Sequence, residues 1–185
     1  MAYWALKTRR SKDNNKGFIR DYWEYFYTNE VIAIGWGKID ISPNNAPSER
    51  DIWDALKKIP DYGYLEKNPR KVTSFIWNFV NLTEDNNILL CHGYSWNQKK
   101  DVRLYGTAKV KDNKWKKKTI GEGERKWECI TRKANIVAFN NKDGKDIPID
   151  TLKGFMGEDK FFIGTLLDLS PEQYERIVKW AEQDC

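Results

Sequence analysis

The sequence runs Val-Ile-Ala-Ile-Gly-Trp-Gly from Val31 to Gly37. Its β-branched and apolar start predicts a buried strand over residues 31–36. Trp36 stands at the end of that strand, between Gly35 and Gly37. Two interpretations of this tryptophan are open from the sequence: a core residue at a strand end, or a flat ring on which a ligand stacks.

The segments on either side of this strand divide into expected helices and expected strands. Helices are expected over residues 18–27, from the N-cap Ser48 to about Ile59, from Pro69 to about Leu82, and from Pro171 onward. Strands are expected over residues 3–8, 88–93, 102–111, 127–139 and 160–166. Helices in the first half and strands in the second predict an α+β fold with a curved or closed sheet. The length suits one domain over residues 1–185, which we expect to be the N-terminal part of a longer protein.

Nine tryptophans are present, and their sequence context divides them. Three lie on apolar faces and are expected in the core, namely Trp4, Trp23 and Trp53. Besides Trp36, the candidates for exposed rings are Trp115 in a lysine run, Trp96 in a polar hairpin tip and Trp77 on the flank of its helix. Aromatic rings interspersed with lysines are typical of proteins that stack nucleic-acid bases and bind the phosphate backbone.

Positive charge is concentrated in one segment. The whole chain carries a net charge of +5, whereas the segment from Lys99 to Lys118 has nine Lys or Arg and two Asp, a local +7. Such a concentration is typical of phosphate binding, and a solvated hairpin that only aids solubility is the alternative. We expect phosphate contacts from Lys109, Lys111, Lys114, Lys116, Lys117 and Lys118.

Several functional classes are disfavoured by what the sequence lacks. The three cysteines form no CxxC pair, which indicates free thiols in a reducing compartment and a cytoplasmic location. The single histidine, His92, disfavours a zinc site or a Ser-His-Asp triad, and no cofactor or metal is expected. An apolar run of about 18 residues is absent, so no membrane span is expected.

Enzyme motifs are also scarce. The sequence has no GxGxxG, Walker, GxSxG or HExxH motif. Glu124-Arg125-Lys126 matches the ExK fragment of a common nuclease site, for which Asp61 or Asp112 is the available metal-binding aspartate. A metal-dependent nuclease using Glu124 and Lys126 therefore remains an alternative function.

Three short stretches resemble a known superfamily. "YWALKT" (Tyr3 to Thr8) resembles the first strand of EVE and YTH domains, which are PUA-like. "VIAIGWGKIDIS" (Val31 to Ser42) is similar to their short apolar strand ending in tryptophan, and "YGTAKV" (Tyr105 to Val110) to their Gly-x-Ala-x-Val strand. The Ile-Gly-Trp-Gly form followed by helices looks most like the EVE-type domains at the N-terminus of McrB-like GTPase restriction subunits.

The resemblance implies a β-barrel flanked by helices, with an aromatic cage that holds an extruded modified base. Trp36 matches the cage tryptophan at the end of the second strand, and Trp115 matches the one in the loop after the Gly-x-Ala-x-Val strand. Trp77 and Trp96 are alternatives for this second wall. Lys7 matches a phosphate-binding lysine of YTH domains. Polar contacts to the base edge are expected from Asp13, Asn14 and Thr8.

The resulting hypothesis is a binding module without enzymatic activity of its own. It flips and reads a methylated base in double-stranded DNA, first N6-methyladenine and second 5-methylcytosine, because YTH domains read the former mark. It is expected to be fused to, or assembled with, a GTPase motor and a nuclease subunit. An RNA-binding PUA-like module is the second alternative, besides the nuclease.

Overall fold

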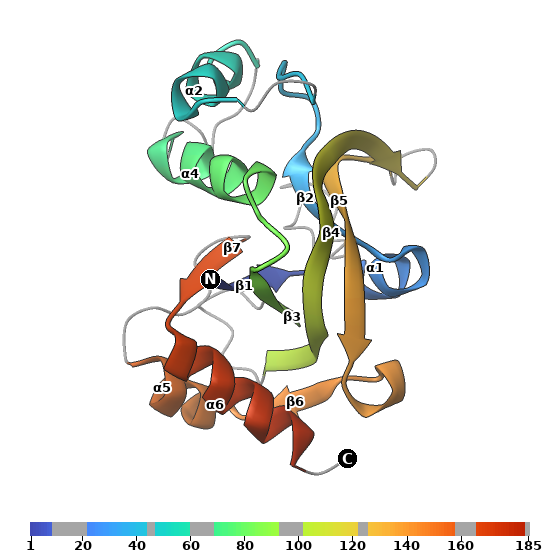
Figure 1. The fold of residues 1–185 in the computed structure, drawn as a ribbon, viewed down its shortest axis with the longest axis vertical. Coiled ribbons are helices and arrows are strands. Elements are labelled where there is room, and N and C mark those ends of the chain that lie inside the picture. The colour runs from blue at the N-terminus through green and yellow to red at the C-terminus, as the bar shows by residue number, and fades with distance from the viewer. Residues whose placement is uncertain are drawn as a thin grey trace, which may run out of the picture. The chain divides into compact units, whose positions relative to one another are not determined.

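The computed structural model contains both helices and strands (Figure 1) and describes residues 1–8, 22–43, 47–59, 69–92, 102–121, 126–157 and 166–183. The strands are β1 (Tyr3–Lys7), β2 (Val31–Trp36), β3 (Asn87–Cys91), β4 (Val102–Ile120), β5 (Trp127–Ala138), β6 (Lys145–Ile147) and β7 (Leu166–Leu169). The helices are α1 (Trp23–Asn29), α2 (Glu49–Leu56), α4 (Pro69–Val80), α5 (Ile149–Met156) and α6 (Pro171–Glu182), with a 3-10 turn, η2, at Asn140–Lys142. The predicted α+β class is confirmed.

The seven strands form a mixed sheet in the order β2-β5-β4-β3-β1-β7, with β6 paired to β4. β1 and β3 are parallel, whereas β1 with β7, β3 with β4, and β4 with β6 are antiparallel. Among the described residues, the sheet is open, with β2 and β7 at its two ends. Of the two expected forms, closure into a barrel is therefore not found in this part of the chain.

The chain divides into two compact units, each assembled from segments distant in sequence. Unit 1 comprises Met1–Val31, Asp85–Lys109 and Ala134–Cys185, and unit 2 comprises Ile32–Glu84 and Val110–Lys133. The expectation of one domain over residues 1–185 stays a prediction. Because each unit is made of separate chain segments, nearness in the sequence does not show which side chains lie in the same unit.

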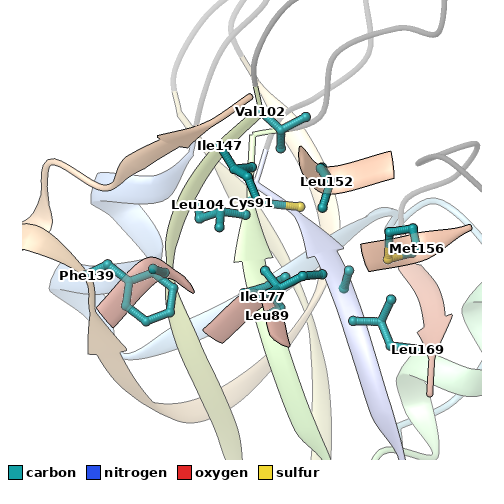
Figure 2. Close-up of a cluster of buried hydrophobic side chains, with 12 residues drawn as sticks. Leu89, Cys91, Val102, Leu104, Phe139, Ile147, Leu152, Met156, Leu169 and Ile177 are labelled. Carbon is teal, nitrogen blue, oxygen red and sulfur yellow. The ribbon is translucent and has the colours of Figure 1, made fainter. Parts of the chain in front are cut away.

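The core of unit 1 is an apolar cluster built from its strands together with α5 and α6 (Figure 2). Apolar residues from β1, β3 and β4 contribute one side of it, among them Leu89 and Leu104, both fully buried. Helix α6 begins at Pro171 after the N-cap Ser170, whose hydroxyl accepts a hydrogen bond from the Gln173 amide at 3.1 Å. Helix α6 packs on α5 and β1, which closes this core.

Unit 2 contains helices α2 and α4, nearly all of strand β2, and the outer halves of β4 and β5, which are their residues from Val110 to Ile120 and from Trp127 to Lys133. Helices α2 and α4 pack on each other, and Ser48 is the N-cap of α2, as its sequence predicts; the structure adds a reciprocal capping box between Ser48 and Asp51. The apolar stripe of α4 is buried, including Val72, Ile76 and Phe79. Strand β2 joins β5 beyond its last residue, where the Gly37 amide donates to the Glu128 carbonyl at 3.1 Å.

Several element boundaries differ from the sequence expectations. Strand β4 continues to Ile120 instead of ending at Lys111, so the loop expected to carry Trp115 is wrong. The lysines of this stretch disfavour a strand locally, but β5 supplies hydrogen-bonding partners along it. The strand expected over residues 160–166 falls, except for Leu166, on residues outside the described chain; strand β7 is described from Leu166 to Leu169. Strand β6 and helix α5 are short and were not expected from the sequence.

Two general features of the chain can be read from the described residues. None of the helices in the described ranges has both the length and the apolar character needed to cross a membrane. Cys91 and Cys129 are buried and form no disulfide within the described residues, and Cys185 lies outside them.

Candidate nucleic-acid interface

Trp36 occupies a strained backbone position at the end of β2. Its φ is +77°, in the left-handed region that bulky side chains rarely adopt and that costs about 1–3 kcal/mol. The side chain is half-buried. Strained residues of this kind cluster at ligand-binding sites, so the conformation distinguishes Trp36 from the other tryptophans that the structure describes.

The glycines on either side of Trp36 have different steric reasons. A Cβ on Gly37 would collide with the Cys129 amide nitrogen and lie 2.6 Å from the Glu128 carbonyl carbon, so β5 approaches too closely for any side chain. A Cβ on Gly35 would lie 3.5 Å from the Trp127 indole nitrogen, an ordinary contact. The Gly-Trp-Gly motif thus sits directly against the start of β5.

A further tryptophan, Trp127, lies close to the Gly-Trp-Gly motif. It is buried at the start of β5, and its indole nitrogen lies beside Gly35, the residue before Trp36. A glycine inside a strand often marks the close approach of another group, and Gly35 is the sequence signal that indicates this neighbour. The structure therefore brings two tryptophans to the end of β2.

Trp115 lies inside unit 2. Only 4% of its surface is exposed, although its neighbours Lys114 and Lys116 are both exposed on β4. The ring has almost no accessible face in this conformation, so stacking on it would require neighbouring side chains to move. Its role as a cage wall stays a prediction, but its expected location in a loop is wrong.

Trp77 is the most exposed candidate in unit 2. With 37% of its surface exposed, it is one of three exposed large hydrophobic residues in the described ranges. Arg70 and Asn81 are also exposed, seven residues before and four after it, which places all three on one side of α4. Trp96 lies outside the described residues, so Trp77 is the accessible alternative for a second wall.

The lysines that were expected to contact phosphates are all exposed on one strand, which we call the lysine strand: Lys109, Lys111, Lys114, Lys116, Lys117 and Lys118 on β4. All but Lys109 belong to unit 2. Asp112 is the acidic residue within β4, and its carboxylate accepts a hydrogen bond from the Lys114 amide at 2.9 Å. On β5, the Glu128 carboxylate lies 3.5 Å from the Lys38 amine. The surface of the lysine strand is therefore strongly positive.

The remaining expected base and phosphate contacts belong to unit 1 or to undescribed residues. Lys7 is half-buried at the end of β1, and Thr8 is buried, with its hydroxyl donating to the Cys91 carbonyl at 3.4 Å. A buried and internally bonded hydroxyl does not suit a base-edge contact in this conformation. Asp13 and Asn14 lie outside the described residues.

Only some of the residues of the nuclease alternative lie in the described part of the chain. Glu124 and Asp61 lie outside it, and Lys126 is exposed just before β5. In the described ranges, no group of three or more His, Cys, Asp or Glu side chains is arranged to hold a metal ion. The alternative is therefore a matter for direct measurement.

No protein-family model matches the chain, and no curated protein matches it either. The similarity of its strands to EVE and YTH domains remains a likeness of short motifs.

Proposed function

We propose that this chain is a PUA-like module of the EVE/YTH type that binds double-stranded DNA and reads a methylated base. The observation that carries the proposal is the lysine strand, which, except for Lys109, lies in the same unit as the half-buried Trp36 and the exposed Trp77. N6-methyladenine is the first candidate mark and 5-methylcytosine the second. A GTPase motor and a nuclease are the proposed partners of this module.

Electrostatics supplies binding that does not depend on sequence. Lysines that contact phosphates release condensed counterions, so affinity falls as salt rises. If four to six residues of the lysine strand make such contacts, a plot of log affinity against log salt should have a slope of roughly −4 to −5. Successive lysines on one face of a strand are about 6.7 Å apart, so Lys114, Lys116 and Lys118 present a regular row of charges.

Stacking supplies the reading of the base. Extruding a base from the duplex costs a few kcal/mol, and each aromatic contact returns about 1–3 kcal/mol. Trp36 is proposed as the main wall, because its strained conformation and its glycine neighbours set it apart. Trp77 is proposed as the second wall in preference to Trp115, since the Trp77 ring is exposed while the Trp115 ring is buried. A methyl group adds only about 1 kcal/mol by area, so the pocket must also be closely shaped and dry.

The test is a binding panel of matched duplexes that carry N6-methyladenine, 5-methylcytosine or no mark. Trp36→Ala should remove the preference for the methylated duplex, a loss of about 5- to 150-fold for one stacking contact, and should retain salt-sensitive binding to all three duplexes. Trp53→Ala is the matched control, because Trp53 is a half-buried tryptophan of the same unit that lies under the Lys57 amine. Equal losses on methylated and unmethylated duplexes would exclude a cage role for Trp36.

A second set of variants separates charge from base reading. Replacing Lys116, Lys117 and Lys118 together by Gln should flatten the salt slope by up to about 3 and weaken all duplexes alike. Lys57→Gln, outside the lysine strand, should leave the slope unchanged. An unchanged slope in the triple variant would mean that the lysine strand does not contact phosphates.

Two further measurements test the competing functions, an RNA-binding module and a nuclease. RNA of matched sequence, added as competitor, should displace the methylated duplex only weakly; strong displacement would favour an RNA-binding module. Incubation of plasmid with Mg²⁺ or Mn²⁺ should leave it intact, whereas cleavage that Glu124→Ala abolishes would establish the nuclease.

A further inference from the structure

Arg132 is a buried cation at the centre of unit 2. It lies on β5, is only 1% exposed, and is among the largest fully buried side chains of the described structure. Its guanidinium donates hydrogen bonds to three backbone carbonyls: Nη1 to Phe79 at 3.2 Å and to Val80 at 2.9 Å, and Nη2 to Asp112 at 2.6 Å. One side chain therefore connects three elements: α4, β4 and β5.

The two sets of carbonyls have different structural roles. Phe79 and Val80 are the last residues of α4, where unpaired carbonyls and the negative end of the helix dipole favour a cation. Asp112 lies on β4 within the lysine strand, and its carboxylate accepts a hydrogen bond from the Lys114 amide. Arg132 thus links the end of α4 to β4 at Asp112.

Arginine is specifically suited to this arrangement. Its planar fork directs its N–H groups along fixed directions, whereas a lysine ammonium is a single point charge. Burial lowers the pKa of Arg132 to about 10, so the side chain remains a cation at neutral pH. In the described structure, its buried Nε has no hydrogen-bonding partner. The burial of Arg132 therefore leaves one of its N–H groups unsatisfied.

The elements that Arg132 joins are those that carry the proposed DNA contacts. Helix α4 carries Trp77, and the Trp77 carbonyl accepts a hydrogen bond from the Asn81 amide in the turn that Arg132 caps. On β4, the lysines of the lysine strand lie both before and after Asp112. We propose that Arg132 is a positioning residue, which holds Trp77 and the lysine strand in one geometry so that a single DNA duplex contacts both.

This inference rests on the proposed function, but one measurement is independent of DNA. Hydrogen exchange should be compared between wild type, Arg132→Met and the matched control Arg50→Met, which removes an exposed arginine of α2. In Arg132→Met, the amides of residues 77–82 and of Lys114 should exchange at least about tenfold faster, with the control unchanged. Wild-type exchange at both places in Arg132→Met would overturn the inference, whatever the protein binds.

The binding measurement is a double-mutant cycle with Trp77→Ala on the methylated duplex. If Arg132 acts by positioning Trp77, then Trp77→Ala should weaken binding at least about fivefold in wild type and less than about twofold in Arg132→Met. Equal losses in the two backgrounds would show that Arg132 acts independently of Trp77 and would overturn the positioning role. If Arg132→Met does not fold, Arg132→Lys takes its place in both measurements, since lysine keeps the charge but not the fork.

Failure of the proposed function has a different signature. A wild-type protein without affinity for any duplex removes the DNA-binding proposal, and hydrogen exchange alone then decides whether Arg132 holds α4 to β4. A wild-type protein that binds DNA but shows additive losses retains the proposed function and loses the positioning role.

Discussion

Replacing Gly37 by alanine is the sharpest steric test of the β2–β5 junction. The added Cβ would lie 2.6 Å from the Glu128 carbonyl carbon, 0.8 Å short of the 3.4 Å at which ordinary contacts begin. Because the opposing atoms are backbone, they cannot rotate away, and such overpacking costs about 1–3 kcal/mol. Displacement of Gly37 also weakens the 3.1 Å hydrogen bond from its amide to Glu128, worth about 1 kcal/mol. We expect a loss of about 2–4 kcal/mol from the free energy of unfolding.

Gly35→Ala is the matched control, because its Cβ meets only the Trp127 indole nitrogen at 3.5 Å. Its free energy of unfolding should stay within about 1 kcal/mol of wild type and should even rise slightly, since alanine is favoured over glycine inside a strand. Urea unfolding followed by far-UV circular dichroism measures both variants, with equal slopes in urea expected. Gly37→Ala as stable as Gly35→Ala would refute the steric account of the Gly-Trp-Gly motif.

Three further predictions concern other parts of the chain. Ser170→Ala removes the N-cap hydroxyl of α6 and should lower the free energy of unfolding by about 1 kcal/mol, measured in urea, with no effect expected from Lys179→Ala on the same helix. Burial raises the pKa of Cys129 to about 12, so in a Cys185→Ser background the folded protein should show no fast-reacting thiol at pH 8, and rapid labelling would contradict its burial. Arg103 donates two hydrogen bonds to Asp146, which lower the pKa of that carboxyl. The stabilisation of the folded protein by this ion pair is therefore present above the unfolded pKa of about 3.9. It is lost as pH falls through the folded pKa of Asp146. Asp146→Asn should thus destabilise by less than about 1 kcal/mol at pH 7 and not at all near pH 2, and a pH-independent effect would argue against the ion pair.

Local sequence patterns predicted the elements whose signals are strong and local. β-branched residues predicted β2 over residues 31–36, and Ser48, Pro69 and Pro171 predicted three helix starts, because capping and proline geometry act within one turn. The outer half of β4 was missed, since its lysines have low strand propensity and only pairing with β5 makes it a strand. Helix ends were less accurate, as α2 stops at Leu56 instead of Ile59.

The candidate site was predicted only in part for the same reason. Charge is a property of composition, so the exposure of the lysine strand followed from the sequence. Whether a tryptophan faces inward or outward depends on which elements pack against it. Trp115, surrounded by lysines in sequence, is buried, whereas Trp77, next to the buried apolar stripe of α4, is exposed.

By itself, the sequence determined the α+β class, the strand ending at Trp36 and the positive charge of residues 99–118, because these depend on composition and on neighbours within a few positions. Only the tertiary structure decided the left-handed conformation of Trp36, the contact of its glycine neighbours with β5 and the burial of Arg132. These features arise where α4, β2, β4 and β5 meet in unit 2. Contacts between segments so far apart in sequence are selected by packing, which no local pattern of residues encodes.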